Sequence, residues 1–156
     1  MPSLLTDRVI KKIYELKPSC ANELRPFFPL HKIGAGVFRN VYRIGRSIVV
    51  IKFPRNKCSV GLTHSRREIN FLQRARKSPD WCILKYYVPA LLYADPNKGT
   101  VAMTYHKTRT KYYSFERETM LEHIFRLAGT RIKDIHKLNI GRNSSDRTPR
   151  LIDFGY

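Results

Sequence analysis

Long apolar runs, cysteine pairs and acidic residues are all scarce in this sequence. No stretch reaches the roughly 18 consecutive apolar residues of a membrane-spanning helix, so no transmembrane segment is expected. The first residues contain no basic region followed by an apolar run, so no signal peptide is expected. The three cysteines form no Cys-x-x-Cys pair, which argues against a zinc site or a disulfide framework. We expect buried, reduced thiols.

The shortage of acidic residues leaves a large positive charge. The 156 residues include 30 lysines and arginines but only 12 aspartates and glutamates, for a formal net charge of +18. This excess predicts attraction to nucleic acid, a phosphorylated ligand, an anionic membrane surface or an acidic protein. A solvated basic surface without a specific partner is the alternative. Nucleic acid is not favoured, because no basic stripe interleaved with aromatic residues is present.

The residues that are present indicate one globular domain of the α+β class. Hydrophobic residues make up 42% of the chain, and no internal repeat or low-complexity linker interrupts it. The periodicity predicts helices at Thr6–Leu16 (capped by Thr6), Ser65–Lys77 and Glu116–Ala128. Branched and aromatic residues predict strands from Ile33 on, at Phe38–Ile44, Ser47–Phe53, Val88–Ala94 and Thr100–Tyr105, with short strands and loops after Arg131. This order favours an antiparallel sheet.

Two stretches of the first half have nucleotide-site chemistry. The segment "IGAGVFRNVY" contains Gly34 and Gly36, which allow backbone N–H groups to approach phosphates, followed by Arg39 and Val41. An ordinary hairpin turn is the alternative. Lys52 stands alone in the apolar run "VVIKF", where a charge needs a partner unless the strand lies at an edge and the lysine faces water.

Glu68 is the candidate partner of Lys52, because it is the only acidic residue between Lys52 and Asp80. The competing interpretation is a helix-capping box made by Ser65 and Glu68. Both interpretations hold together only if the helix begins at Thr63 or earlier.

Oxygen-bearing side chains near the C-terminus have the spacing of a phosphotransfer site. Asp134 and Asn139 stand five residues apart, as in the Asp-x-x-x-x-Asn loop of kinases. Asp153 follows the apolar residues Leu151 and Ile152 and begins Asp-Phe-Gly. Phosphoryl transfer needs a carboxylate at the attacking hydroxyl and further groups that hold a metal on the phosphates.

Taken in order, these motifs resemble the protein kinase superfamily over roughly residues 30–156. The resemblance implies that Lys52 positions ATP phosphates and is held by Glu68, that Asn139 and Asp153 hold Mg²⁺, and that Asp134 acts as base. It further implies ATP contacts from the glycine-rich segment (Gly34, Gly36, Val41), from His136, and from the gatekeeper and hinge region at Met103 and Tyr105.

The departures from the family pattern define a reduced architecture. His-Arg-Asp is replaced by Ile132-Lys133-Asp134, and the sequence contains no activation segment after Asp-Phe-Gly. We therefore expect a minimal bacterial or phage kinase-like protein. Its parts would be an N-terminal helix and connection (1–29), an antiparallel-sheet N-lobe with its helix C (30–105) and a reduced, mostly helical C-lobe (106–156). The analogy with short kinase effectors implies a partner protein that completes or activates the domain.

The predicted function is an ATP- and Mg²⁺-dependent phosphotransferase, foremost a Ser/Thr protein kinase of the cytoplasm, or of a host cytosol if it is an effector. A pseudokinase or binding module that holds an acidic partner through its basic surface is the first alternative. A kinase of small molecules or of lipopolysaccharide sugars is the second, because such kinases share the Asp-x-x-x-x-Asn and Ile-Asp patterns.

Overall fold

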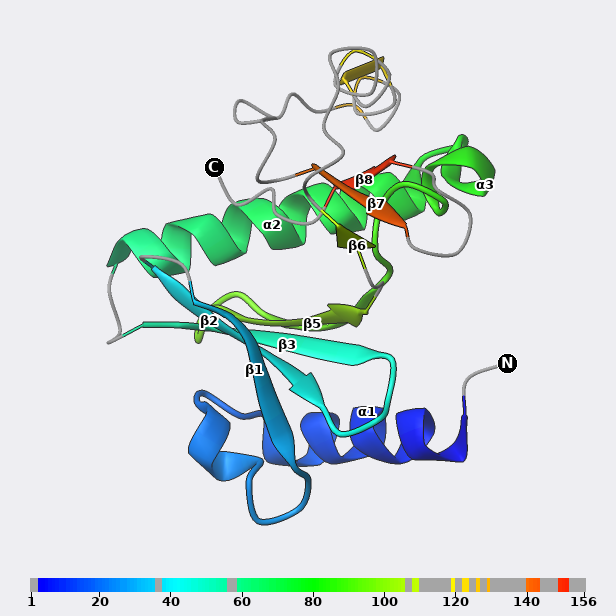
Figure 1. Cartoon of the computed structure of the whole chain (residues 1–156). Helices are drawn as coiled ribbons and strands as arrows, with labels where there is room; N and C mark the ends of the chain where they lie inside the picture. The colour runs from blue at the N-terminus through cyan, green and yellow to red at the C-terminus, as the bar shows by residue number, and fades with distance from the viewer. Residues whose placement is uncertain are drawn as a thin grey trace. The chain divides into compact units, whose positions relative to one another are not determined.

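The structure, a computed structural model, contains two compact units (Figure 1). Unit 1 comprises Met1–Arg66 and Leu91–Tyr105, and unit 2 comprises Arg67–Ala90 and His106–Tyr156. The residues that the structure describes are 3–35, 38–55, 59–105, 108–109, 119, 122–123, 126, 129, 140–143 and 149–151. The division into an N-lobe and a C-lobe at about residue 105 stays a prediction.

Helix α1 (Leu4–Leu16) opens unit 1. Its cap is Ser3, whose side chain accepts a hydrogen bond from the Thr6 amide at 3.2 Å, so the prediction of Thr6 as the cap was wrong. Thr6 lies inside the first turn and is buried, and its hydroxyl is 3.1 Å from that of Ser3. The helix ends at Lys17, which takes a left-handed conformation with φ 47° and donates its amide to the Ile13 carbonyl.

The main sheet of unit 1 has five antiparallel strands in the order β1-β2-β3-β5-β4. The strands are β1 (Leu30–Ala35), β2 (Arg39–Ile44), β3 (Val49–Pro54), β4 (Leu91–Asp95) and β5 (Thr100–Thr104). The predicted hairpin is confirmed, and its turn uses Gly45 at φ +53°, where a side chain would be strained. The α+β class with an antiparallel sheet is therefore confirmed.

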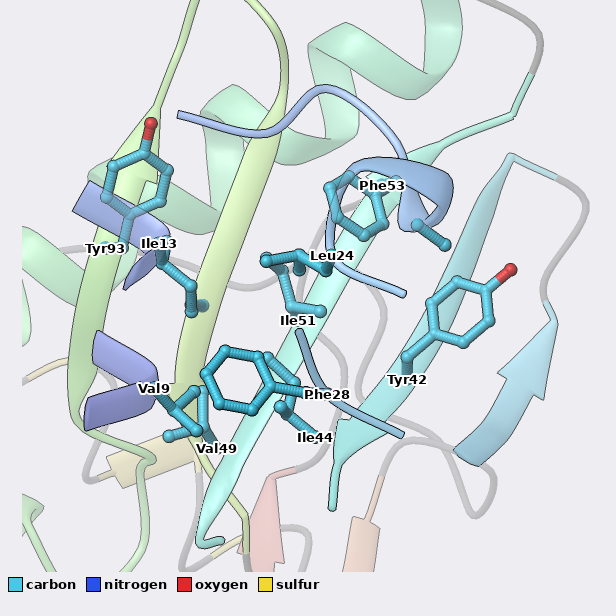
Figure 2. Close-up of a cluster of buried hydrophobic side chains, with 12 residues drawn as sticks. Val9, Ile13, Leu24, Phe28, Tyr42, Ile44, Val49, Ile51, Phe53 and Tyr93 are labelled. Atoms are coloured by element: carbon cyan, nitrogen blue, oxygen red, sulfur yellow. The ribbon is translucent and has the colours of Figure 1, made fainter. Parts of the chain in front are cut away.

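The core of unit 1 lies between α1 and one face of this sheet. Figure 2 shows Val9 and Ile13 of α1 directed at Val49 and Ile51 of β3. The short 3₁₀ helix η1 (Ala21–Glu23) and the connection after it add Leu24 and Phe28 to this cluster. The connection before η1 is tied to the sheet by the Thr100 hydroxyl, which donates to the Pro18 carbonyl at 2.7 Å. Alternate residues of the strands thus form an apolar layer with α1.

Helix α2 (Ser59–Lys77) begins six residues before the predicted start at Ser65. Ser65 is buried inside the helix, so a capping box of Ser65 with Glu68 is wrong. The apolar face of the helix is buried, as predicted, while its basic residues are exposed: Arg66, Arg67, Arg74, Arg76 and Lys77. A short helix α3 (Trp81–Leu84) follows, which the sequence patterns did not predict.

Unit 2 also contains a small antiparallel sheet in the order β6-β7-β8. Its strands are β6 (Thr108–Arg109), β7 (Ile140–Asn143) and β8 (Pro149–Leu151). Strands β7 and β8 agree with the short strands predicted after Arg131, whereas β6 was not predicted. The predicted helix at Glu116–Ala128 lies largely outside the described residues.

Two further expectations concern cysteines and membrane spans. Cys20 and Cys82 are free but exposed, so the prediction of buried thiols was wrong for both, and Cys58 lies outside the described residues. Within the described part of the chain, no helix has the length and apolarity needed to cross a membrane.

Candidate functional site

The second face of the five-stranded sheet, opposite α1, carries the candidate site. In register, Gly34 of β1 lies opposite Val41 of β2, Val41 lies opposite Lys52 of β3, and Lys52 lies opposite Val101 of β5. Directly opposed residues of antiparallel strands project from the same face. These residues therefore form one row across the sheet, which we call the Lys52 row. Three of the predicted site residues, Gly34, Val41 and Lys52, are brought together in it.

Lys52 occupies a buried position at the middle of this row. Strand β3 lies between β2 and β5, and the Lys52 side chain is only 4% exposed. The interpretation of Lys52 as an edge-strand residue that faces water is therefore wrong. Because an ammonium group is rarely buried without compensation, this position calls for carboxylate or ligand partners.

The charges on this face are all positive among the residues of the five strands. Arg39 and Arg43 project from the same side of β2 as Val41, so they share the face of Lys52. The only carboxylate in the five strands is Asp95, which is opposite Thr100 and shares the α1 face with it. An anionic ligand on the Lys52 face would meet cations and no acidic strand residue.

Arg39 is the member of this face that the sequence analysis left out of the site. It replaces a glycine of the nucleotide-loop pattern, and its side chain is only 5% exposed. The strand pattern gave no signal of this burial, because Arg39 shares its face with Val41 and with a second cation, Arg43. Arg43, by contrast, is half-buried, donates its Nε to the Ser47 carbonyl and lies 4.6 Å above the Tyr105 ring.

Gly34 has room for a side chain. A Cβ at Gly34 would lie 3.7 Å from the Cβ of Val41, which is ordinary contact, and the residue does not need a positive φ. Neither space nor backbone strain therefore requires glycine here. The register of β1 shifts between Lys32 and Gly34, so this glycine marks an irregularity of the strand, and close approach of a ligand to the backbone would be a further reason for glycine here.

Met103 and Tyr105 were predicted to contact the adenine. Met103 is buried on β5, directly opposite Val50 and on the same face as Lys52. Tyr105 follows β5 and is half-buried, and its backbone amide donates to the Ile48 carbonyl. An adenine would therefore be recognised by groups of the predicted hinge other than the Tyr105 N–H.

Glu68 lies in α2 and is fully buried. It belongs to unit 2, whereas Lys52 belongs to unit 1, and their pairing stays a prediction. The turns of α2 before Glu68 pack within unit 1. A Cβ at Gly61 would lie 2.8 Å from the Phe38 carbonyl oxygen, the His64 ring meets the Phe38 ring edge-on at 4.9 Å, and the Arg66 Nε donates to the Pro96 carbonyl at 2.9 Å.

The other predicted residues lie outside the described part of the chain. These are Gly36, Asp134, His136, Asn139 and Asp153. Among the described residues, no group of three or more His, Cys, Asp or Glu side chains is arranged to hold a metal ion. No model of a known protein family and no curated protein matches this sequence.

Proposed function

We propose that the chain is an ATP- and Mg²⁺-dependent phosphotransferase with a kinase-like arrangement, foremost a minimal Ser/Thr protein kinase. The observation that carries this proposal is the buried lysine in the third strand, Lys52, on a sheet face with cations and no strand carboxylate. In protein kinases the phosphate-binding lysine likewise lies on the third strand and pairs with a glutamate of the next helix. The order of Lys52 on β3 and Glu68 on α2 agrees with this plan.

On the nucleotide side, Lys52 would bind the α- and β-phosphates and Glu68 would hold its ammonium group. Both groups are buried, and an ion pair between them costs less free energy than two charges buried separately. Gly34 and Gly36 would let the backbone approach the phosphates, while Val41, Met103 and Tyr105 would border the base. Arg39 adds a buried cation on the same face, and we assign it to phosphate binding as well.

On the acceptor side, Asp134 would receive the proton of the attacking hydroxyl and His136 would contact the γ-phosphate. The hydroxyl oxygen forms a bond to the γ-phosphorus, the bond from that phosphorus to the bridging oxygen of ADP breaks, and ADP leaves. Asn139 and Asp153 offer amide and carboxylate oxygens, which are the donors that Mg²⁺ prefers. When bound, the ion would neutralise phosphate charge.

A second candidate function is binding of an acidic protein without phosphotransfer. The exposed cations of α2 favour it, because Arg67, Arg74 and Lys77 recur at helical spacing on the solvent side. An activating partner protein of a kinase would use the same chemistry. A sugar hydroxyl, as in lipopolysaccharide-sugar kinases, is the alternative acceptor.

The cytosol is the compartment that we propose, of the producing cell or of a host. ATP is available there, and the free exposed thiols of Cys20 and Cys82 favour a reducing environment.

Thermal unfolding with and without Mg·ATP tests the nucleotide site. A ligand present at 100 times its Kd stabilises the folded state by about 2.7 kcal/mol, which for a chain of this size raises Tm by about 5–10 °C. We expect this rise in the wild type and its loss in Lys52→Met and in Asp153→Ala. Lys32→Met is the matched control, because Lys32 is an exposed lysine of the same sheet, outside the Lys52 row.

Transfer of labelled γ-phosphate to the chain, to a generic Ser/Thr substrate and to a sugar acceptor then separates the candidate functions. Loss of transfer in Asp134→Asn with the Tm rise intact would support the kinase. A Tm rise without any transfer would favour the pseudokinase. A well-folded wild type that shows no Tm rise contradicts the nucleotide site altogether.

A further inference from the structure

A polar cavity lies on the α1 side of unit 1, on the other face of the sheet from the Lys52 row. It has a volume of about 240 Å³ and is formed where η1 meets the ends of β2 and β3. Asn40, Tyr42 and Phe53 line it, and Asn40 is directly opposite Phe53 in the register of the sheet. These residues alternate with Val41 and Lys52, so the cavity is on the α1 face. The volume is below the roughly 300–1,000 Å³ of pockets for drug-sized ligands, which indicates a smaller molecule.

The charge of this cavity is positive. Arg25 and Arg55 line it, and no carboxylate is among its described lining residues. The Arg25 guanidinium lies 5.9 Å from the centre of the Tyr42 ring, a cation–π distance that holds this charge at the cavity wall. Two guanidinium groups match the charge of about −1.5 to −2 on a phosphate monoester better than the single charge of a carboxylate.

One buried acceptor in the cavity wall has no partner. The Asn40 side-chain oxygen is buried and has no hydrogen-bond partner among the described residues. A buried acceptor left unsatisfied is destabilising, and such groups in folded proteins call for a specific explanation. A ligand with a hydroxyl donor would satisfy it. The Tyr42 and Phe53 rings, which Figure 2 shows at one side of the core cluster, supply apolar contact beside these polar groups.

We propose that this cavity binds a small phosphorylated molecule that also carries a hydroxyl group. The phosphate meets Arg25 and Arg55, and the hydroxyl donates to Asn40. The site is separate from the proposed phosphotransfer function, because it lies on the other face of the sheet and uses none of the residues assigned to ATP. Its test is therefore independent of whether the chain is a kinase.

The exposed thiol of Cys20 lines the cavity and provides the readout, with Cys82 as an internal control outside it. Cys20 makes only a long contact, 3.9 Å, from its sulfur to the Glu23 carboxylate, so it is open to reagents. Iodoacetamide labelling followed by peptide mapping gives both rates in one sample of the full chain. The probes are glycerol 3-phosphate, inorganic phosphate and glycerol, at constant ionic strength.

Glycerol 3-phosphate is expected to slow labelling of Cys20 in a saturable way while labelling of Cys82 is unchanged. Inorganic phosphate should protect more weakly and glycerol should not protect. Arg25→Gln and Arg55→Gln should each weaken protection about tenfold or more, because each removes charge-assisted hydrogen bonds. Arg46→Gln is the matched control, since Arg46 is an exposed arginine in the hairpin turn and does not line the cavity.

Asn40→Leu gives a signature that general charge attraction cannot produce. It should remove the advantage of glycerol 3-phosphate over inorganic phosphate and leave Tm unchanged or raised, because an unsatisfied buried acceptor is lost. The proposal is overturned if Cys20 is not protected by either phosphate, if Cys82 is protected equally, or if Arg25→Gln and Arg55→Gln behave like Arg46→Gln.

Discussion

Ile51 and Lys52 are neighbours on β3, yet they project from opposite faces of the sheet into different chemistry. Ile51 is fully buried in the apolar layer with α1, and Lys52 is almost as buried on the cationic face. Burial of Ile51 stabilises the fold by removing apolar surface from water. Burial of Lys52 desolvates a charge, which opposes folding unless partners compensate. Stability alone therefore explains the burial of Ile51, whereas the burial of Lys52 calls for compensating partners.

Substitution of the two neighbours should separate these roles. Ile51→Ala removes buried methyl and methylene groups and should lower the free energy of unfolding by about 2–5 kcal/mol, measured by urea denaturation. The Tm rise on addition of Mg·ATP should persist in Ile51→Ala at temperatures where the variant is folded. Lys52→Met should instead abolish the nucleotide response. Because it would leave the buried Glu68 of the proposed pair without its cation, it should also lower the free energy of unfolding by about 3–5 kcal/mol. Equal effects of the two substitutions on both measurements would contradict the division between the faces.

The turn between β4 and β5 offers the next test, because a positive φ and close packing both favour glycine at position 99. Gly99 has φ +73°, and a Cβ there would lie 2.6 Å from the Pro54 Cγ and 2.8 Å from the Leu62 Cδ2. We expect Gly99→Ala to lower the free energy of unfolding by about 1–3 kcal/mol. Gly129→Ala is the matched control. Gly129 has φ +76°, and an added Cβ would meet no atom within 4 Å, so this substitution introduces backbone strain without a packing clash. A Gly99→Ala loss no larger than the Gly129→Ala loss would refute the packing argument.

Substitution of Gly61 tests whether close packing against Phe38 positions the start of α2. Alanine is favoured over glycine in a helix by about 1 kcal/mol, but a Cβ at Gly61 would overlap the Phe38 carbonyl oxygen at 2.8 Å. Because that oxygen belongs to the backbone, the overlap should outweigh the propensity and give a net loss of about 1 kcal/mol. Asn70→Ala, at an exposed position of the same helix, should be neutral or slightly stabilising. If urea denaturation shows that both variants are more stable than the wild type, the neighbours of Gly61 move to accept the added Cβ and the packing argument fails.

The same glycine explains why the start of α2 was not predicted. Residues 59–64, Ser-Val-Gly-Leu-Thr-His, contain a glycine and weak helix formers, so local propensity favours a loop. The structure forms helix there because Gly61 and His64 pack on Phe38 and Pro54, which is a tertiary effect. The hairpin was predictable because its signals, branched strands and Gly45, are local.

The residues of the candidate site also differ in whether local sequence signals predicted them. Lys52 was predictable because one charge in a run of valine and isoleucine is conspicuous, and the strand register then placed Val41 beside it. The burial of Arg39 was not predicted, because Arg39 and Arg43 share one face of β2 and the strand pattern does not distinguish a buried from an exposed cation. The ligand cavity at Asn40 depends on η1, far away in the sequence, and no pattern within β2 indicates it.

The smallest expected effect is a change in stability at alkaline pH, caused by Tyr93 on the α1 face. Burial, followed by the nearby charge of Asp95, raises the pKa of Tyr93 above its ordinary value near 10. The Tyr93 ring meets that of Tyr14 edge-on at 5.1 Å, so ionisation would place a charge against an aromatic contact. In the unfolded chain Tyr93 loses its proton first, so the stability that this group contributes is complete below about pH 10 and is lost as the pH rises through the folded-state pKa.

Tyr93→Phe should therefore reduce the fall of the urea midpoint above about pH 10 and change it little at pH 8. Tyr86→Phe is the control, because the Tyr86 side chain is 55% exposed. If the urea midpoints of Tyr93→Phe and the wild type fall equally at alkaline pH, ionisation of Tyr93 does not contribute to the loss of stability.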